Sequence, residues 1–382
     1  MRASREGALL AAVCLMLGCT ETSSTAESGV DLGGLGGGGN ADGMQSDAVL
    51  PDARPADATL PSDAGETPAD MGVSVPADME VVDPPDASGS ADAEVEELPD
   101  AAGPMGDGCG APPGANDQVW DLNHDGRPRQ FKVHLPPDYD PAVRTPVVIN
   151  FHGRALNAEA QVGVSGMNDV ADEGGFIAVH PEGTGEREQT WNGGLCCGDS
   201  ARDDVDDVGF TAAMLDQLER SLCIDTRRVY ATGISNGGFM SHRLACELSD
   251  RIAAIAPVAG TIVTLSCNPG RPVPVFQFHG DDDRIVPYDG FVGVASVEST
   301  TDGWLDRNGC MGGSEIFFEA DDVRCEAWSQ CRDGAEVRLC TILGGGHTWP
   351  GGERLGIFGY TTQTISASQM MWDFFTEHAL PE

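Results

Sequence analysis

The stretch from Arg228 to Met240 reads RVYATGISNGGFM, an apolar run that leads into a serine set among three glycines. Glycine costs conformational entropy on folding, so such a cluster is expected where φ must be positive or where two backbones pass very close. The spacing from Gly233 to Gly237 is the G-x-S-x-G pattern, whose serine sits on a sharp turn between a strand and a helix. A single match can arise by chance in a glycine-rich chain, so Ser235 is a candidate nucleophile that the rest of the sequence must support.

Short apolar runs alternate with helix-like segments beyond residue 108. The apolar runs are continuous, as is typical of strands buried on both faces, and they cover residues 145–153, 175–183, 227–233, 252–260, 273–280 and 336–343. Helices are expected over residues 206–222, 236–250 and 366–380. The alternation predicts an α/β fold, with a mainly parallel sheet and helices on both faces. In such folds, functional residues gather at the carboxyl ends of the strands.

The chain before this region has a different composition. Residues 1–19 combine two arginines with a short apolar run that ends at Leu17-Gly18-Cys19, which resembles a bacterial lipobox. We therefore predict a lipoprotein-type signal peptide with Cys19 as the lipidated residue, and keep a plainly secreted protein as the alternative. Residues 20–108 are rich in Ala, Asp, Pro and Gly and hold no aromatic residue, which predicts a disordered acidic tether. Residues 109–382 are expected to form one folded domain.

Charge and cysteine content narrow the choice of partners and compartment. The formal charge is −39, so the chain lacks the basic surface that nucleic acid requires, and anionic lipid headgroups are disfavoured for the same reason. Contact with a membrane is expected only through a lipid on Cys19. The other cysteines beyond the leader lie between Cys109 and Cys340, and their even number in an exported chain indicates disulfides of undefined connectivity.

Two later segments supply what a serine nucleophile needs. A base must take the proton of the serine, and a carboxylate must orient that base. In this class of fold the chain order is serine, acid, histidine. The expected strand 273–280 is followed by Asp281, Asp282 and Asp283, and the expected strand 336–343 is followed by His347 in a glycine-rich loop. The order and the positions at strand ends support a catalytic set.

The oxyanion formed during attack needs preorganised N–H donors. The backbone amide of Asn236, directly after the serine, is one candidate, and the amide of Arg154, in the loop after residues 145–153, is the other. His152 and His279 both precede a glycine at a strand end, and we interpret them as structural rather than catalytic.

The segment DLNHDGRPRQFK matches the opening of a calcium loop at Asp121, Asn123, Asp125 and Gly126. The position that should carry a bidentate glutamate is Lys132, a cation where an anion is required. We therefore reject a calcium site and expect a turn before a strand. No other pattern indicates a metal or a cofactor.

Seven motifs resemble, in order, those of the secreted feruloyl esterases and polyhydroxybutyrate depolymerases of the α/β-hydrolase superfamily: INFHG, TWNGG.CCG, DDVGF, RVYATGISNGG, APVAG, FHGDDDRIVPY and GGGHTWPGG. The resemblance covers nearly all of residues 109–382 and none of the tether. It implies an α/β-hydrolase fold and a serine esterase without cofactor. It makes Ser235 the nucleophile, Asp283 the acid and His347 the base, although Asp281 and Asp282 stand where the family usually has small uncharged residues.

The same resemblance implies a disulfide pairing and a substrate. It pairs Cys310 with Cys331, which leaves Cys325 for Cys340. The motifs around Cys196-Cys197 are similar to the branch that hydrolyses feruloyl or acetyl esters on plant cell-wall polysaccharide, with polyhydroxybutyrate depolymerase as the alternative. The expected pocket residues are Trp191, Asn192 and Trp349, with core packing as the alternative for Trp191.

Two readings of other classes remain open. One is a non-catalytic binding protein displayed at the cell surface with the same fold, and the other is a serine peptidase of that fold. We expect a monomeric enzyme of the cell envelope or the extracellular space that acts on a polymeric ester.

Overall fold

The computed structural model describes residues 108–185, 188–264, 266–354 and 356–382. The predicted signal peptide, with Cys19, and all of the predicted tether except Gly108 lie outside the described residues. Within those residues, no helix has the length and apolar character needed to cross a membrane.

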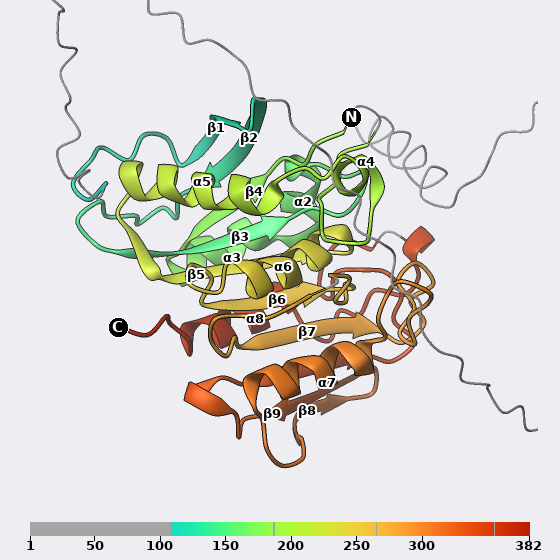
Figure 1. The fold of residues 1–382 in the computed structure, drawn as a ribbon. Coiled ribbons are helices and arrows are strands. Elements are labelled where there is room, and N and C mark those ends of the chain that lie inside the picture. The colour runs from blue at the N-terminus through green and yellow to red at the C-terminus, as the bar shows by residue number, and fades with distance from the viewer. Residues whose placement is uncertain (1–107, 186–187, 265, 355) are drawn as a thin grey trace, which may run out of the picture. The chain divides into compact units, whose positions relative to one another are not determined.

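A mixed sheet forms the centre of the domain (Figure 1). The strand order is β1-β2-β4-β3-β5-β6-β7-β10-β9-β8. The strands are β1 (Asp117–His124), β2 (Arg127–His134), β3 (Thr145–Phe151), β4 (Ile177–Pro181), β5 (Ile224–Ile234), β6 (Ala254–Val258), β7 (Val275–Gly280), β8 (Glu315–Ala320), β9 (Val323–Trp328) and β10 (Val337–Ile342).

The six strands predicted from continuous apolar runs are the six parallel ones, β4, β3, β5, β6, β7 and β10. Antiparallel hairpins extend the sheet at both ends, β1 with β2 and β8 with β9. Of these four strands, the sequence indicated only β2, as the strand after the expected turn; the edge strands β1 and β8 alternate between exposed and partly buried residues and lack a continuous apolar run. The predicted α/β class is confirmed.

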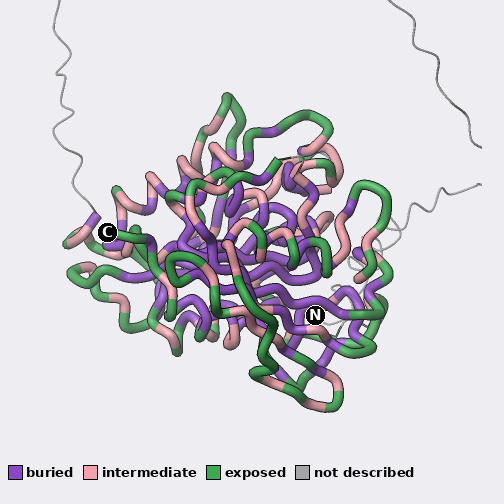
Figure 2. The backbone as a smooth tube through the Cα atoms, turned by 60° about the horizontal axis from the view of Figure 1, so that its bottom comes forward, coloured by how far each residue is buried: buried purple, intermediate pink, exposed green. Residues whose placement is uncertain are grey.

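Helices cover both faces of the sheet. They are α2 (Ala158–Ser165), α3 (Met167–Gly174), α4 (Gly198–Arg202), α5 (Asp207–Ser221), α6 (Asn236–Glu247), α7 (Val297–Asn308) and α8 (Ala367–Thr376). The three helices expected from the sequence correspond to α5, α6 and α8. The strands of the central sheet appear as the buried interior in Figure 2.

Alternate residues of each strand enter two separate cores. Val147 and Ile149 of β3 belong to the core that includes α5 and α6, whereas Val148 belongs to the core that includes α3 and α8. Successive strand side chains point to opposite faces, so a sheet covered on both sides needs apolar residues at every position. This is why the parallel strands could be recognised from the sequence.

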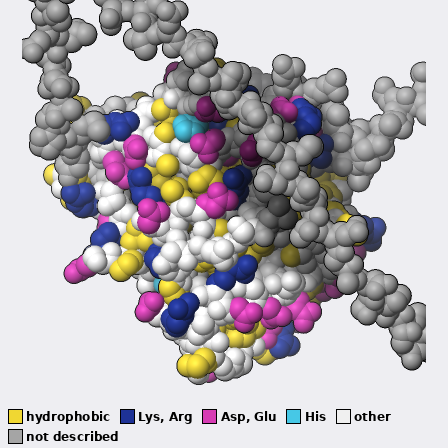
Figure 3. All heavy atoms as spheres, in the orientation of Figure 1, with side chains coloured by type: hydrophobic (Ala, Val, Ile, Leu, Met, Phe, Trp, Pro, Cys, Tyr) yellow, Lys and Arg dark blue, Asp and Glu magenta, His cyan; other side chains and the backbone are white. Residues whose placement is uncertain are grey.

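The rejected calcium segment forms the β1–β2 hairpin. Asp125 and Gly126 connect the strands with φ of 49° and 71°, the left-handed values that a two-residue hairpin turn requires. The predicted turn before a strand is confirmed. On the face shown in Figure 3, acidic and basic side chains of the described residues are interspersed.

Five disulfides join the ten cysteines of the domain. The pairs Cys310–Cys331 and Cys325–Cys340 are those implied by the resemblance, so that prediction is confirmed. The remaining bridges are Cys109–Cys223, Cys196–Cys197 and Cys246–Cys267. This density of disulfides is typical of proteins that fold in an oxidising compartment outside the cytoplasm.

Candidate active site

Ser235 occupies a sharp turn between β5 and α6. Its backbone has φ 57° and ψ −119°, a conformation that non-glycine residues rarely adopt. Its amide donates a hydrogen bond to the carbonyl of Val258 at 2.9 Å, and its carbonyl accepts from the amide of Phe239 at 2.9 Å. These bonds hold the strained turn in place, and strain of this kind concentrates at functional sites.

The neighbouring glycines permit a close approach of backbones rather than a positive φ. A Cβ on Gly233 would lie 2.5 Å from the carbonyl oxygen of Phe151 in β3. A Cβ on Gly237 would overlap the same oxygen. The start of α6 therefore packs directly on the end of β3, and a side chain at either position would force the two segments apart.

Asp283 and His347 are brought together by neighbouring parallel strands. Asp283 follows β7 and His347 follows β10, and His347 Nδ1 lies 2.7 Å from Asp283 Oδ2. The other oxygen, Oδ1, accepts the amides of Ile285 and Val286 at 2.8 and 2.9 Å. Burial alone would raise the pKa of Asp283, but His347 and these hydrogen bonds outweigh it and lower the pKa, which keeps the buried carboxylate charged.

The other two aspartates of the run have different partners. Asp281 Oδ1 accepts the amide of Gly344 at 2.5 Å, and Asp282 pairs with Arg284 at the surface. His279 lies 3.5 Å from Asp283 Oδ2, but its Nε2 is also 2.8 Å from the carbonyl of Val286. Among the three candidate acids, Asp283 is the one that contacts His347.

The Ser235 hydroxyl makes no hydrogen bond to any residue that the structure describes. It lies at the end of β5, whereas His347 lies after β10, and β6 and β7 lie between these two strands in the sheet. Catalytic hydrogen bonds are often long before substrate binds and tighten in the reacting complex. All three side chains follow carboxyl ends of parallel strands, so they share one edge of the sheet.

The loop that carries His347 is held by hydrogen bonds to a segment that follows it in the chain. The amide of His347 donates to the carbonyl of Phe358 at 2.7 Å, and the amide of Gly346 donates to the carbonyl of Tyr360 at 2.9 Å. The segment 358–364 therefore supports the loop from one side. The sequence analysis gave no role to this segment.

A carboxylate at the tip of the β8–β9 hairpin fixes that supporting segment in turn. Asp322 accepts the hydroxyls of Tyr360, Thr362 and Thr364 at 2.8, 2.5 and 2.7 Å. The bonds from Thr362 and Thr364 are the main cause of the lowered pKa of Asp322. We call this group of four side chains the Asp322 clamp. The three hydroxyl residues lie 38 to 42 residues after Asp322, so only the tertiary structure reveals the clamp.

The two predicted oxyanion donors lie at suitable chain positions. Asn236 is the first residue of α6, and amides of a first helical turn have no acceptor within their helix. The amide of Arg154 takes part in none of the backbone hydrogen bonds recorded for the described residues, and its guanidinium pairs with Glu188. Both amides are therefore available to a ligand.

The side chain of Asn236 has a structural use. Its Oδ1 accepts the amide of Trp191 at 2.7 Å, and its Nδ2 donates to the carbonyl of Trp191 at 2.9 Å. This reciprocal pair ties the first turn of α6 to the loop after β4. The backbone amide of Asn236 is thus fixed while its side chain is occupied.

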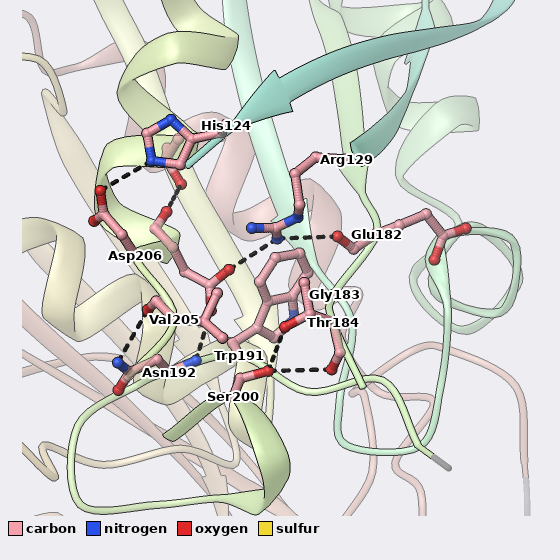
Figure 4. Close-up of polar contacts among 12 residues, drawn as sticks. His124, Arg129, Glu182, Gly183, Thr184, Trp191, Asn192, Ser200, Val205 and Asp206 are labelled. Atoms are coloured by element: carbon pink, nitrogen blue, oxygen red, sulfur yellow. Dashed lines mark hydrogen bonds and ion pairs between the residues drawn. The ribbon is translucent and has the colours of Figure 1, made fainter. Parts of the chain in front are cut away.

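A buried ion pair supports the same loop (Figure 4). Arg129 donates to Asp207 Oδ1 at 2.8 Å, and Asp207 Oδ2 accepts the amide of Asn192 at 2.8 Å. The Asn192 side chain donates to Asp204 and to the carbonyl of Val205. Sequence reasoning missed this pair because the two residues are 78 residues apart: Asp207 lies in the motif DDVGF, but nothing in that motif indicates Arg129 as its partner.

The three predicted pocket residues are buried in packing positions. Trp191 has an exposed fraction of 0%, and its indole donates to the carbonyl of His152. Trp349 has an exposed fraction of 2%, and its indole donates to Ser368 Oγ at 3.0 Å. Asn192 is 3% exposed. A buried indole presents no face to a ligand, so the structure corrects the expectation that substrate stacks on Trp191 or Trp349; packing against Phe151 and His152 decides the place of Trp191.

His152 and His279 are structural, as the sequence suggested. His152 is fully buried, its Nε2 accepts the amide of Gly183 at 2.9 Å, and its Nδ1 lies 2.8 Å from the carbonyl of Gly153. Burial lowers the pKa of His152 to about 4, so the ring is neutral at pH 7. Both ring nitrogens are engaged with the backbone.

A separate apolar cluster lies among the loops at the sheet edge that carries the candidate catalytic residues. It consists of Phe239, Val263, Val286 and Val294, with Ile285 and the Cys196–Cys197 disulfide packed against them. Phe239 is one helical turn beyond Ser235, and Ile285 and Val286 bind the carboxylate of Asp283 through their amides. The cluster therefore adjoins both the candidate nucleophile and the candidate acid.

One group of side chains has the spacing of a metal site. Glu336, Glu377 and His378 place one ligand atom each within 4.8 Å of the others. The guanidinium of Arg338, however, donates to both carboxylates at 2.7 and 2.5 Å. The positive charge that a metal would supply is already present, so this group does not fit a cation.

The sheet order and the turn at Ser235 define an α/β-hydrolase. Residues 166–270 match the model of the prolyl oligopeptidase family, Peptidase_S9. The chain is 32% identical to "Feruloyl esterase B" of Piromyces equi over 66% of this chain and 46% of the relative. It is 30% identical to "Putative esterase NocK" of Nocardia uniformis subsp. tsuyamanensis over 65% of this chain and 79% of the relative.

Among solved structures, the acetyl xylan esterase from Aspergillus awamori matches 68% of this chain and 99% of its own, with a TM-score of 0.47 and 14% identity. The chain spans about half the length of the fungal feruloyl esterase and most of the length of the Nocardia protein. The chain belongs to the same family of α/β-hydrolases as the Nocardia putative esterase, and it has feruloyl esterase homologues.

Proposed function

We propose that the protein is a serine carboxylic ester hydrolase in which Ser235, His347 and Asp283 form the catalytic set. The contact that carries this proposal is the 2.7 Å hydrogen bond between His347 Nδ1 and Asp283 Oδ2, at the sheet edge where β5 ends in Ser235. Asp283 holds His347 in the tautomer with its proton on Nδ1, which leaves Nε2 free to act as a base.

The reaction proceeds through an acyl-enzyme. His347 Nε2 removes the proton of the Ser235 hydroxyl as Oγ attacks the ester carbonyl, and then donates that proton to the leaving alcohol. The amides of Asn236 and Arg154 stabilise the oxyanion. Water, activated by His347, attacks the acyl group in a second step and releases the acid and free Ser235.

The substrate proposed is a feruloyl or acetyl ester on plant cell-wall polysaccharide. The names of the relatives support this class, since they include feruloyl esterases and an acetylxylan esterase. The partly exposed members of the apolar cluster, Ile285 and the Cys196–Cys197 disulfide, support an apolar acyl group, because they supply apolar surface close to Asp283. This surface replaces the indoles of Trp191 and Trp349, which were expected to bind substrate.

Polyhydroxybutyrate depolymerase is the second candidate function. The loop after Asp283 carries Phe291 and Val292 at its tip with exposed fractions of 54% and 100%, and Leu195 is 58% exposed on the loop that contains the Cys196–Cys197 disulfide. Exposed apolar side chains close to a catalytic edge suit contact with an apolar polymer. The choice is decided by comparing release of ferulate from methyl ferulate and of acetate from acetylated xylan with clearing of a polyhydroxybutyrate suspension.

The substitution Ser235→Ala tests the mechanism and excludes a non-catalytic role. We expect a loss of activity on short nitrophenyl esters of about 10³-fold or more. The melting temperature should stay unchanged, because the hydroxyl makes no hydrogen bond to a described residue. A fluorophosphonate probe should label the wild type and not the variant. Full activity in the variant would refute the mechanism.

We propose that the esterase domain, residues 109–382, is a monomer exported from the cytoplasm and held at the cell envelope by a lipid on Cys19. Disulfides and fungal feruloyl esterase relatives support export. Several acyl chains on one cysteine would anchor the protein firmly, and residues 20–108 would give the domain reach. Recovery of the wild type from culture medium with Cys19 unmodified by mass spectrometry would contradict the anchor.

A further inference from the structure

A concave site lies at the edge of the sheet opposite the candidate catalytic residues. It is a pocket of about 410 Å³ lined by Arg271, Arg307 and Arg332, with Asp333 as its single acidic residue. Arg271 precedes β7, Arg332 precedes β10 and Arg307 lies near the end of α7. The catalytic residues follow the other ends of β7 and β10, so the pocket is separate from the active site.

The three guanidiniums are held by backbone carbonyls. Arg271 donates to the carbonyls of Ser249, Ile252, Ala253 and Pro272. Arg307 Nε donates to the carbonyl of Cys267 at 3.0 Å, and Arg332 Nη2 donates to the carbonyl of Arg307 at 2.7 Å. Carbonyl oxygens orient a guanidinium without neutralising it.

No carboxylate of the described residues forms an ion pair with any of these three arginines. This is unusual in a chain with 61 acidic and 22 basic residues. Arg251, for comparison, pairs with both Asp216 and Glu219. Burial lowers the pKa of Arg271 to about 10, as expected for a partly buried charge without a counter-ion.

Two disulfides make the pocket rigid. Cys267, which lines it, is bonded to Cys246 of α6, and Cys331, directly before Arg332, is bonded to Cys310. In addition, Asn308 forms a reciprocal pair of hydrogen bonds with the backbone of Val273, which fixes the end of α7 against the start of β7. The cationic groups are therefore preorganised, which reduces the entropy lost when a ligand binds.

We propose that this pocket binds an oxyanion. Both terminal amino groups of Arg307 have no hydrogen-bond partner among the residues described, and they can meet a carboxylate or a phosphate in the bidentate manner that guanidinium favours. Two kinds of ligand carry such an oxyanion: an acidic polysaccharide, through its uronic acid carboxylates, and free inorganic phosphate. The site is independent of the proposed esterase activity.

Calorimetric titration of the full chain tests the site, with trigalacturonate and inorganic phosphate as the two anionic probes and neutral xylotriose as the control. We expect at least one anion to bind with an affinity that falls with added salt, and xylotriose not to bind. Binding of phosphate alone would identify a free anion as the ligand, and binding of trigalacturonate alone would identify the polysaccharide.

The double variant Arg307→Gln/Arg332→Gln should bind the same anion at least tenfold more weakly. Arg271 is left intact, because its four carbonyl partners make it part of the fold. Arg220→Gln, which removes an exposed charge from α5, is the matched control and should bind as the wild type does. Ester hydrolysis should be unchanged in both variants. Absence of anion binding in the wild type, or equal binding by the double variant, would overturn the proposal.

Discussion

The loops that carry Ser235 and His347 reach the same edge of the sheet but are stabilised differently. The Ser235 turn is fixed by its own neighbours: Gly233 and Gly237 allow α6 to pack on β3, and Ser235 itself takes the positive φ. The His347 loop is fixed by residues outside it, through the carbonyls of segment 358–364 and through the Asp322 clamp.

Both loops carry a glycine-rich motif, but what holds the His347 loop is not visible in its own motif. A turn that depends on close backbone contacts needs glycine at fixed spacing, and the spacing is visible in the sequence. The His347 loop also needs glycine, since a Cβ on Gly346 would overlap the carbonyl oxygen of Phe358, but the hydroxyls and carbonyls that hold this loop belong to other segments. The two loops should therefore respond to different substitutions.

Gly237→Ala should have the largest effect on stability, because the new Cβ would overlap the carbonyl oxygen of Phe151. Overpacking typically costs about 1–3 kcal/mol, and a collision with backbone places this variant at about 3 kcal/mol or more. Chemical denaturation measures the change. Gly163→Ala is the matched control, since this exposed position in α2 has no atom within 4 Å of the added Cβ. A stable, active Gly237→Ala variant would show that the turn does not depend on close packing.

Removing the Cys325–Cys340 disulfide tests whether this bridge positions the His347 loop in addition to stabilising the fold. The bridge spans 15 residues and joins β9 to β10, so Cys325→Ser/Cys340→Ser should lower the free energy of unfolding by about 3 kcal/mol. We also expect kcat to fall, because β10 leads directly into the loop.

The double variant Cys310→Ser/Cys331→Ser is the control for that experiment. Its bridge spans 21 residues and should lower stability to a similar extent. Cys331 precedes β10, whereas the His347 loop follows it, so kcat should stay unchanged. Equal kcat values for both double variants under folding conditions would show that the β9–β10 bridge does not position His347.

Asp322→Ala should lower kcat about tenfold with little change in KM, because a misplaced base weakens the transition state more than substrate binding. Asp322→Asn should recover part of the loss, since its amide oxygen still accepts hydroxyl hydrogen bonds. Asp321→Ala removes the neighbouring exposed carboxylate, which forms no hydrogen bond or ion pair with a described residue, and should match the wild type. A wild-type kcat in Asp322→Ala would show that the Asp322 clamp does not position His347.

The smallest effect should appear in the pH dependence of stability. The folded pKa of Asp283 lies below its unfolded value of about 3.9, so its charge stabilises the fold above about pH 4, and this contribution is lost as the pH falls through the folded pKa. The difference in free energy of unfolding between the wild type and Asp283→Asn should therefore shrink on acidification below pH 4. A difference that stays constant down to pH 2 would contradict the lowered pKa.

The sequence determined the parallel strands, the order of the candidate catalytic residues and the turn at Ser235. Each of these leaves a local trace, because buried strands need continuous apolar runs and the turn needs glycine. The bridges Cys310–Cys331 and Cys325–Cys340 came from resemblance instead, since spacing alone does not define connectivity.

Only the tertiary structure decided which aromatic residues are buried and which distant residues hold the site. Trp191 lies in a motif beside the site, yet its indole is buried against Phe151 and His152. The Asp322 clamp and the pocket formed by Arg271, Arg307 and Arg332 join residues that are distant in the chain. The physical reason is that burial and charge pairing depend on which segments pack together, and single residues of ordinary type carry no sign of their future neighbours.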